Sequence, residues 1–199
     1  MTIFSQILKD GGAKGHLPGL TKTSRRWFRQ TARDFAGSTS SGTVSARSRI
    51  TQEGKKVSAP RIGSMYHFVY DPKGKKTLPY YDKFPLIFMV GPATNGFYGI
   101  NLHYLPPSYR AALMDKLYQI SSDRKFNEHT KLNLSYNVLK GASKFKYFKP
   151  TFKRYLAPHV RSRFLKIDSN EWDIALMLPT QNFAKATSGK VYSDSRGMI

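Results

Sequence analysis

Apolar side chains recur at helical spacing in three stretches of the sequence. In the first stretch, a short amphipathic helix is predicted from the positions of Ile3, Phe4, Ile7 and Leu8. A second helix is predicted to begin with Ser24 as its N-cap and to end at Gly37. A third is predicted from Ser108, directly after a pair of prolines. The chain between the second and third helices has the pattern of strands.

Three strands are predicted there, from runs of apolar and aromatic residues at 65–70, 84–90 and 97–102. The first run stops at Asp71-Pro72, and residues 91–96 make the turn between the other two. Together with the helix that follows, these strands predict an α+β fold. Its sheet is either a small antiparallel one or a partly open β-barrel, with a packed helix.

The C-terminal half has weaker patterns. Residues 161–167 predict a further strand, whereas 171–178 fit either a strand or a buried helix. Residues 182–186 predict a short turn of helix, and 132–139 are ambiguous between strand and helix.

Charge is concentrated in two parts of the chain. The 199 residues include 33 Lys and Arg against 12 Asp and Glu, a formal net charge of +21. Residues 1–61 carry +9 and residues 121–166 carry +10, whereas 62–120 carry only +3 and 167–199 carry −1. We therefore expect extended basic arms around a near-neutral centre. The predicted units are an N-terminal arm with short helices, 1–61, and an α+β core, 62–199, that includes a basic-aromatic segment, 121–166.

Composition also predicts which parts of the chain fold poorly alone and which chemistry is missing. The stretch from Gly37 to Pro60, rich in Ser, Thr, Gly, Arg and Lys, predicts disorder in the isolated chain. No cysteine is present, and acidic residues are too few for clustered carboxylates. No phosphate-binding loop, dinucleotide fingerprint or nucleophile elbow occurs. We expect no enzymatic activity, no cofactor, no small-molecule substrate and no membrane insertion.

Two histidines indicate a structural role rather than a metal site. His67 and His103 lie in predicted strands and are expected to approach each other across the sheet. We interpret them as buried structural residues rather than as metal ligands.

Two basic clusters are the candidate binding residues for a polyanion or a partner protein: Arg25, Arg26, Arg29, Arg33, Lys144, Lys146, Lys149, Lys153, Arg154, Arg161 and Arg163. Cations can neutralise phosphates while neighbouring Phe and Tyr rings stack on bases. The alternative for the second cluster is an amphipathic element with rings toward the core and lysines toward solvent. For the first, the alternative is pairing with carboxylates of a neighbouring subunit.

Two motifs, LPYYDKFPL at 78–86 and GINLHYLPP at 99–107, resemble a family of virion proteins of contractile-tailed bacteriophages, the myoviruses. In the first motif, Tyr80, Tyr81 and Asp82 precede the most apolar strand, and in the second, Asn101, His103 and Tyr104 precede a double-proline corner. These residues suit side-chain hydrogen bonds that lock a sheet edge to a helix. The motifs are therefore interpreted as scaffold.

The resemblance implies a virion protein that assembles in the bacterial host cytoplasm, with other virion proteins as partners. The first expected role is a structural component of tail, baseplate or neck that ties subunits together through basic arms. The alternatives are a DNA-binding or DNA-end-protecting virion protein, with nucleic acid as partner, and a ribosomal-type RNA-binding protein.

Overall fold

The computed structural model describes residues 2–19, 21–37, 42–121 and 146–199. Within them, six strands form one antiparallel sheet with the order β1-β7-β2-β4-β5-β6. The strands of this sheet are β1 (Lys55–Val57), β2 (Met65–His67), β4 (Leu86–Ala93), β5 (Gly96–Asn101), β6 (Phe152–Leu156) and β7 (Phe164–Ile167). A separate antiparallel pair consists of β3 (Tyr81–Asp82) and β8 (Phe183–Ala184). The α+β class and the antiparallel sheet are confirmed, and the sheet is open at β1 and β6 rather than closed into a barrel.

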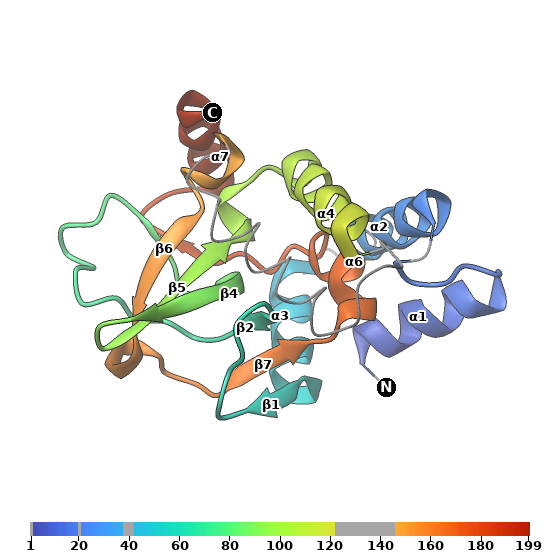
Figure 1. Cartoon of the computed structure of the whole chain (residues 1–199), viewed down its shortest axis with the longest axis horizontal. Coiled ribbons are helices and arrows are strands. Elements are labelled where there is room, and N and C mark those ends of the chain that lie inside the picture. The colour runs from blue at the N-terminus through green and yellow to red at the C-terminus, as the bar shows by residue number, and fades with distance from the viewer. Residues whose placement is uncertain (1, 20, 38–41, 122–145) are drawn as a thin grey trace.

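Helices cover the sheet mainly from one side. The described α-helices are α1 (Ile3–Ala13), α2 (Lys22–Gly37), α3 (Gly42–Glu53), α4 (Pro107–Ser121), α6 (Trp172–Ala175) and α7 (Ser188–Met198). Short 3₁₀ turns are η1 (Leu102–Tyr104), η3 (Lys146–Phe148), η4 (Ala157–His159) and η5 (Ser169–Glu171). In Figure 1, α1, α2, α4 and α6 gather to the right of the sheet, while α7 lies apart from them near β6.

Strand β4 explains the continuous apolar run at 84–90. Leu86, Phe88 and Val90 belong to the core cluster shared with the helices, whereas Ile87 and Met89 belong to a second, aromatic-rich cluster. Successive side chains of a strand point to opposite faces. Since both faces of β4 are covered from Leu86 to Val90, no position in this part of the strand favours a polar residue.

The N-terminal helices pack against the sheet instead of extending from it as an arm. Their buried members in the helix-side cluster are Ile3, Phe4, Ile7, Phe28, Ala32, Ala46 and Ile50. Gly11 lets α1 approach α2 closely, because a Cβ at this position would lie 2.5 Å from the ring of Phe28. The expectation of an extended arm is corrected here, because the apolar faces of these helices complete the core.

Helix α3 lies in the stretch that composition predicts to be disordered. Ala46 and Ile50, one helical turn apart, are 1% and 3% exposed, and Arg47 Nη1 donates to the carbonyl oxygen of Gln181 at 2.9 Å. Two apolar residues at i and i+4 are enough to hold this helix in place, because the rest of the same chain supplies the apolar surface against which they pack. Composition averages over the whole stretch and does not reveal this pair.

Smaller differences have local causes. Helix α2 begins before Ser24, because the hydroxyl of Thr21 accepts the Ser24 N–H at 3.0 Å and so acts as the cap. Of the two alternatives for 171–178, helix is correct. The helical turn predicted at 182–186 is wrong, because Phe183 and Ala184 pair with β3, about a hundred residues away in the sequence. Helix α7 was not predicted, and residues 132–139 lie outside the described part of the chain.

The packing of α2 predicts the effect of a core truncation. Replacing Phe28, which is 1% exposed, with Ala should lower the free energy of unfolding of the whole domain by about 3–5 kcal/mol. Leu17→Ala, at a residue that is 56% exposed, should change it by less than about 0.5 kcal/mol. Urea denaturation followed by circular dichroism measures both. An unchanged main transition in the Phe28 variant would mean that residues 1–61 fold apart from the sheet.

Candidate functional site

Two of the four predicted arginines of α2 are already paired within the chain. Arg25 Nε lies 3.2 Å from the carboxylate of Asp115. Arg29 contacts Asp115 at 2.9 Å and Asp173 at 2.6 Å. Since Asp173 is buried, the Arg29 pair holds α2 against α6. The partners expected for these arginines were phosphate or a neighbouring subunit's carboxylate, and the structure supplies carboxylates of the same chain instead.

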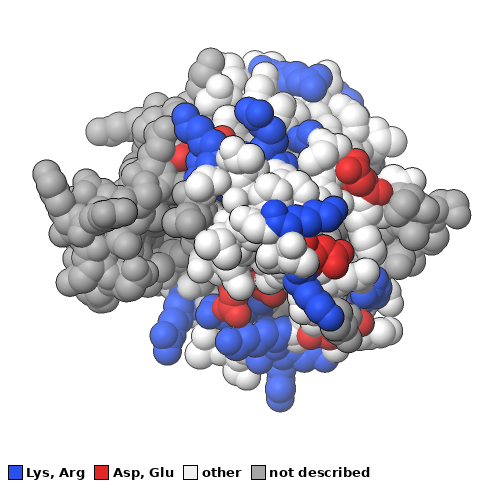
Figure 2. Space-filling view, turned by 90° about the vertical axis from the view of Figure 1, so that its right-hand side faces the viewer, with Lys and Arg blue, Asp and Glu red and all other residues white. Residues whose placement is uncertain are grey.

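The other two, Arg26 and Arg33, are exposed. With Lys22 they line a hollow of about 240 Å³ between α2 and α4. On this side of the molecule, Lys and Arg are interspersed with Asp and Glu (Figure 2). The α2 face is therefore a mixed surface rather than a continuous basic patch.

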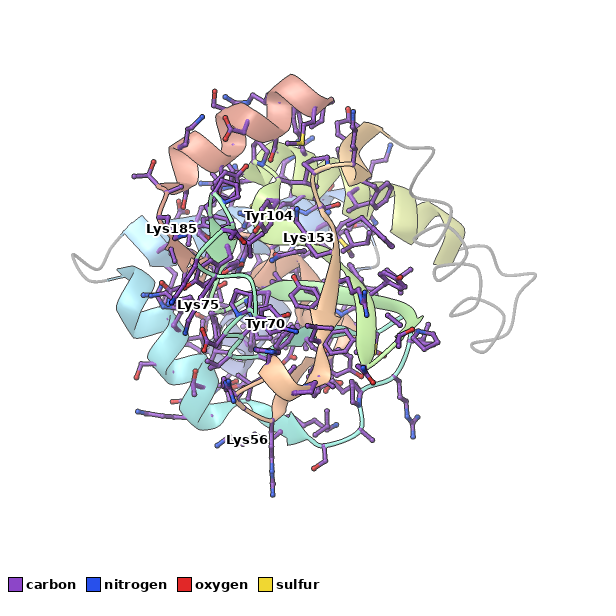
Figure 3. The ribbon with its side chains drawn as sticks, turned by 90° about the vertical axis from the view of Figure 1, so that its left-hand side faces the viewer. Lys56, Tyr70, Lys75, Tyr104, Lys153 and Lys185 are labelled. Carbon is purple, nitrogen blue, oxygen red and sulfur yellow. The ribbon has the colours of Figure 1, made fainter. Side chains whose placement is uncertain are left out.

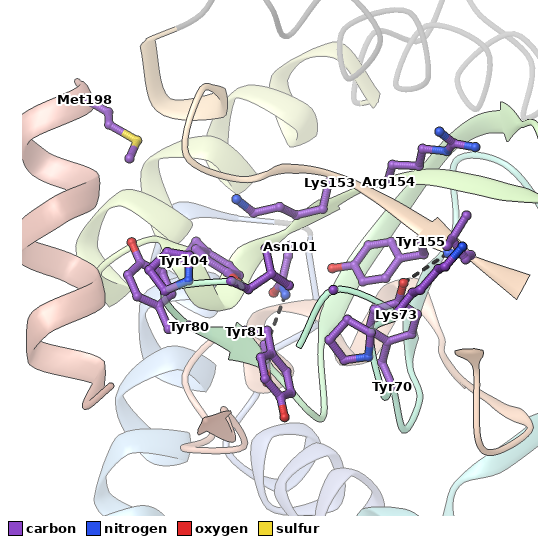
Figure 4. Close-up of a pocket in the computed structure, with 16 residues that line it drawn as sticks. Tyr70, Lys73, Tyr80, Tyr81, Asn101, Tyr104, Lys153, Arg154, Tyr155 and Met198 are labelled. Atoms are coloured by element: carbon purple, nitrogen blue, oxygen red, sulfur yellow. Dashed lines mark hydrogen bonds between the residues drawn. The ribbon is translucent and has the colours of Figure 1, made fainter. Parts of the chain in front are cut away.

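A larger pocket, of about 480 Å³, lies at the opposite side of the molecule (Figure 3). Its walls come from β6, from residues 70–82 and from the end of α7. The close-up in Figure 4 shows rings and cations directed into it from several elements. Five tyrosines line it: Tyr70, Tyr80, Tyr81, Tyr104 and Tyr155. The cations among its lining residues are Lys73, Lys153 and Arg154.

One wall of this tyrosine pocket is a loop, residues 71–80, that internal hydrogen bonds keep in place. The backbone N–H of Leu78 donates to the carbonyl oxygen of Gly74 at 2.9 Å. The ammonium group of Lys185 donates to the carbonyl oxygens of Lys76 and Leu78, each at 3.0 Å. The loop leads directly into the β3–β8 pair, so the wall is anchored at both of its ends.

The floor of the pocket rests on the buried carboxylate of Asp82. One oxygen accepts the backbone N–H groups of Phe84 at 3.0 Å and Asn182 at 3.1 Å. The other accepts from Asn101 Nδ2 at 3.2 Å and from His103 Nδ1 at 2.7 Å. Asp82 of the first sequence motif thus bonds to Asn101 and His103 of the second, and these bonds join β3 to the end of β5 and to η1.

These bonds set the protonation states. Burial by itself favours the neutral acid, but His103 and the N–H donors outweigh it and lower the pKa of Asp82. Burial lowers the pKa of His103 despite the adjacent carboxylate, so this imidazole is neutral. Burial, together with the nearby ring of His103, lowers the pKa of His67 to about 3. The two histidine rings do approach each other, with centroids 5.6 Å apart.

Lys153 projects from β6 into the pocket. Its Nζ lies 4.2 Å from the centroid of the Tyr104 ring, a cation–π distance. Burial lowers the pKa of Lys153 to about 8, so most molecules carry the charge at neutral pH. Among the described residues, no carboxylate pairs with this ammonium group. The pocket therefore holds a cation without a direct carboxylate partner among the described residues, while the nearest ionised group of its lining, Asp82, is buried and bonded to four N–H donors.

A hydroxyl, an imidazole and a carboxylate are connected in the protein interior. His103 Nε2 lies 3.0 Å from the hydroxyl of Thr180, while its Nδ1 bonds to Asp82. The same order of groups activates nucleophiles in hydrolases. Here Thr180 and His103 are both 0% exposed, so the hydroxyl has no contact with a substrate. We interpret the chain of bonds as structural.

The remaining predicted cations do not form one surface. Arg154 is exposed, and its Nη2 donates to the carbonyl oxygen of Thr94 at 2.7 Å. Lys149, Arg161 and Arg163 are also exposed, away from the pocket lining. Lys144 and the side chain of Lys146 lie outside the described part of the chain. Of the predicted set, Lys153 and Arg154 alone are found among the lining residues of the tyrosine pocket.

The tyrosines were not identified as one site from the sequence. Their positions fell in a strand, in the scaffold motifs and in the basic-aromatic segment. A usable signal was the i, i+2 spacing of Lys153 and Tyr155, which puts both on one face of strand β6. In β6, a lysine and a ring thus line the same pocket.

Membrane-spanning helices and metal clusters are both absent from the described residues. No helix among them is long and apolar enough to cross a membrane. Nor do they contain a group of three or more His, Cys, Asp or Glu side chains placed to hold a metal ion.

Comparison with known proteins gives one family. The family model described as phage T4 terminal DNA protecting protein matches residues 9–198, which include both sequence motifs and every wall of the tyrosine pocket. No curated protein and no solved structure matches the chain.

The Asp82 carboxylate yields a stability prediction. In Asp82→Asn, one acceptor oxygen becomes a donor and faces N–H groups that then lack an acceptor. Each buried donor left unbonded costs about 1–3 kcal/mol, so the free energy of unfolding should fall by about 2–5 kcal/mol. Asp71→Asn, at an exposed carboxylate bonded to Lys75, should leave the urea midpoint nearly unchanged. Equal midpoints for the two variants would contradict the role of Asp82.

The buried histidines yield a pH prediction. Below about pH 6.5 the unfolded chain protonates His67, whereas the folded protein does not until about pH 3. Stability should therefore fall as the pH drops below 6.5, with a slope approaching about 1.4 kcal/mol per pH unit from this residue. Urea titrations between pH 7 and 5 measure it. The His67→Gln variant should show a shallower pH dependence of stability. Identical slopes for the wild type and the variant would contradict the lowered pKa of His67.

Proposed function

Because this chain belongs to the phage T4 terminal DNA protecting protein family, we propose that it is a virion protein that binds the ends of double-stranded DNA and shields them. The observation that carries the proposal is the tyrosine pocket, in which Lys153 presents a charge without a carboxylate partner among the described residues. Rings and cations together suit nucleic acid, because phosphates need charge and bases need stacking surfaces.

The charge balance of the chain supports a polyanionic partner. The net charge is +21, and several described carboxylates are already paired inside the protein. Asp115 and Asp173 pair with arginines of α2, and Asp82 is buried beneath the pocket. The positive charges of such a surplus repel one another. The phosphates of a DNA partner offset this repulsion, and the counterions that the DNA releases favour binding.

The proposed role requires no turnover. A protein that shields an end must bind there and exclude nucleases, and the Thr180–His103–Asp82 chain is buried. Assembly in the host cytoplasm, before the DNA is enclosed, belongs to the same proposal. The structural role in tail, baseplate or neck is the alternative, in which the surplus charge meets acidic surfaces of other virion proteins. We rank it second, because stacking surfaces are not needed for that contact.

The test compares free and closed DNA ends. The purified protein is titrated with a blunt duplex and with a duplex of equal length whose two ends are closed by hairpin loops. We expect tighter binding to the open duplex, and slower digestion of that duplex by a double-strand exonuclease when the protein is present. Equal affinity for the two DNAs would reject end binding. Weak binding to both at physiological salt would favour the structural role.

A salt series tests the α2 arginines separately. If Arg26 and Arg33 contact phosphates, replacing both with Ala should reduce the slope of log K against log salt by about 0.9 for each phosphate that the variant leaves unneutralised. Lys166→Ala is the matched control, because its ammonium group already pairs with Asp168 at 2.7 Å. A slope that is the same in the double variant and the control would remove α2 from the DNA-binding surface.

A further inference from the structure

We infer that the tyrosine pocket holds one unpaired terminal nucleotide of a DNA strand, with its base against the tyrosine rings and its phosphate near Lys153. The inference rests on the proposed binding of DNA ends and assigns a place to the terminal nucleotide. It follows from the shape of the pocket, from its rings and from the charge inside it.

The size and form of the pocket suit a single nucleotide. Its volume of about 480 Å³ lies within the range of about 300–1,000 Å³ that is usual for small-ligand sites. Proteins that accept one unstacked nucleotide do so in a pocket with aromatic walls and a few polar groups. Here the rings come from opposite sides, with Tyr80 and Tyr104 facing Tyr70 and Tyr155 in Figure 4.

The rings are held in position by the protein and need no rearrangement to form the pocket. The hydroxyl of Tyr70 accepts the backbone N–H of Leu156 at 3.1 Å. Tyr104 packs edge-on against Phe183, with ring centroids 5.2 Å apart. Tyr80 is half-buried at the rim, and burial together with the nearby carboxylate of Asp194 in α7 raises its pKa. Tyr70, Tyr104 and Tyr155 are buried and shape the pocket, whereas the half-buried rings of Tyr80 and Tyr81 leave apolar surface for a base to cover.

The position of Lys153 selects an anionic ligand. Its ammonium group is half-buried over Tyr104, and burial without a counter-charge disfavours the charged form. A phosphate at this point supplies the missing charge. Lys73, from the loop wall, is exposed at the rim and adds a second cation near the entrance. A neutral aromatic ligand leaves the charge of Lys153 uncompensated.

An end carries what this site requires, and a continuous duplex does not. Bases inside a duplex are paired and stacked, so each must be unpaired before it can enter a pocket. A terminal overhang is already unpaired. Capture of that nucleotide makes the protein prefer ends, whereas general attraction to phosphates is equal along the whole duplex.

The experiment varies only the last nucleotide of the DNA. Duplexes of equal length carry blunt ends, a one-nucleotide overhang of 3′ or 5′ polarity, or the same overhang as an abasic nucleotide with its phosphate retained. For at least one polarity we expect the overhang to bind about 5- to 100-fold tighter than its abasic counterpart. No difference for either polarity, measured on the wild-type protein, overturns the inference. If the abasic overhang raises the affinity over the blunt duplex as much as the intact overhang does, the pocket binds only the phosphate, and the inference is also overturned.

Variants then locate the effect. Tyr80→Leu should shrink the difference between intact and abasic overhangs at least fivefold. Lys153→Met should weaken intact and abasic overhangs alike, relative to the blunt duplex, because both overhangs keep the phosphate. Lys56→Met removes the same charge from exposed strand β1, far from the pocket in Figure 3, and should weaken all duplexes equally. If Lys153→Met behaves like Lys56→Met, the pocket is not the binding site. If the wild-type protein still prefers the open duplex over the hairpin-closed one, that result rejects the nucleotide pocket but leaves the proposed function intact. If the wild-type protein shows no such preference, the nucleotide pocket and the proposed function are both rejected.

Discussion

The carboxylate of Asp82 holds together parts of the chain that are distant in sequence. Its two oxygens accept N–H groups from the segment before β4, the end of β5, η1 and the segment before β8. A buried charge is stable only when hydrogen bonds replace its water, and four donors provide that replacement. The loop wall of the tyrosine pocket, its floor and the C-terminal strand pair all meet at this group. A substitution at Asp82 therefore disturbs the loop wall, the floor and the strand pair together.

Half-buried Arg29 and buried Arg110 act in the same way on the helices. Arg29 joins α2 to α6 through Asp173. Arg110, 1% exposed, donates to the carbonyl oxygens of His103, Leu105 and Leu176 and to the hydroxyl of Tyr192. The planar guanidinium reaches several acceptors at once, which suits a cation that joins separate segments. Part of the basic charge in the sequence thus serves the fold, and the count of Lys and Arg overstates what is free to bind a partner.

The cations still available for a partner differ in setting. On α2 they are exposed and mixed with carboxylates, an arrangement that supports weak, salt-sensitive contacts. In the tyrosine pocket, Lys153 is half-buried beside aromatic rings, where water screens its charge less and its direction is fixed. General attraction to a polyanion and recognition of one nucleotide are therefore separable properties of this protein. The first depends on net charge, and the second on geometry.

By itself, the sequence determined the α+β class, helices α1, α2 and α4 and the buried strand β4, because local periodicity and residue type report burial directly. It missed α3, β8 and α7, and it placed Arg25 and Arg29 on a binding surface. Only the tertiary structure decided which cations face carboxylates and that Tyr70, Tyr104 and Lys153 share a pocket. The physical reason is that these neighbours are set by the pairing of strands far apart in the sequence, which local patterns do not encode.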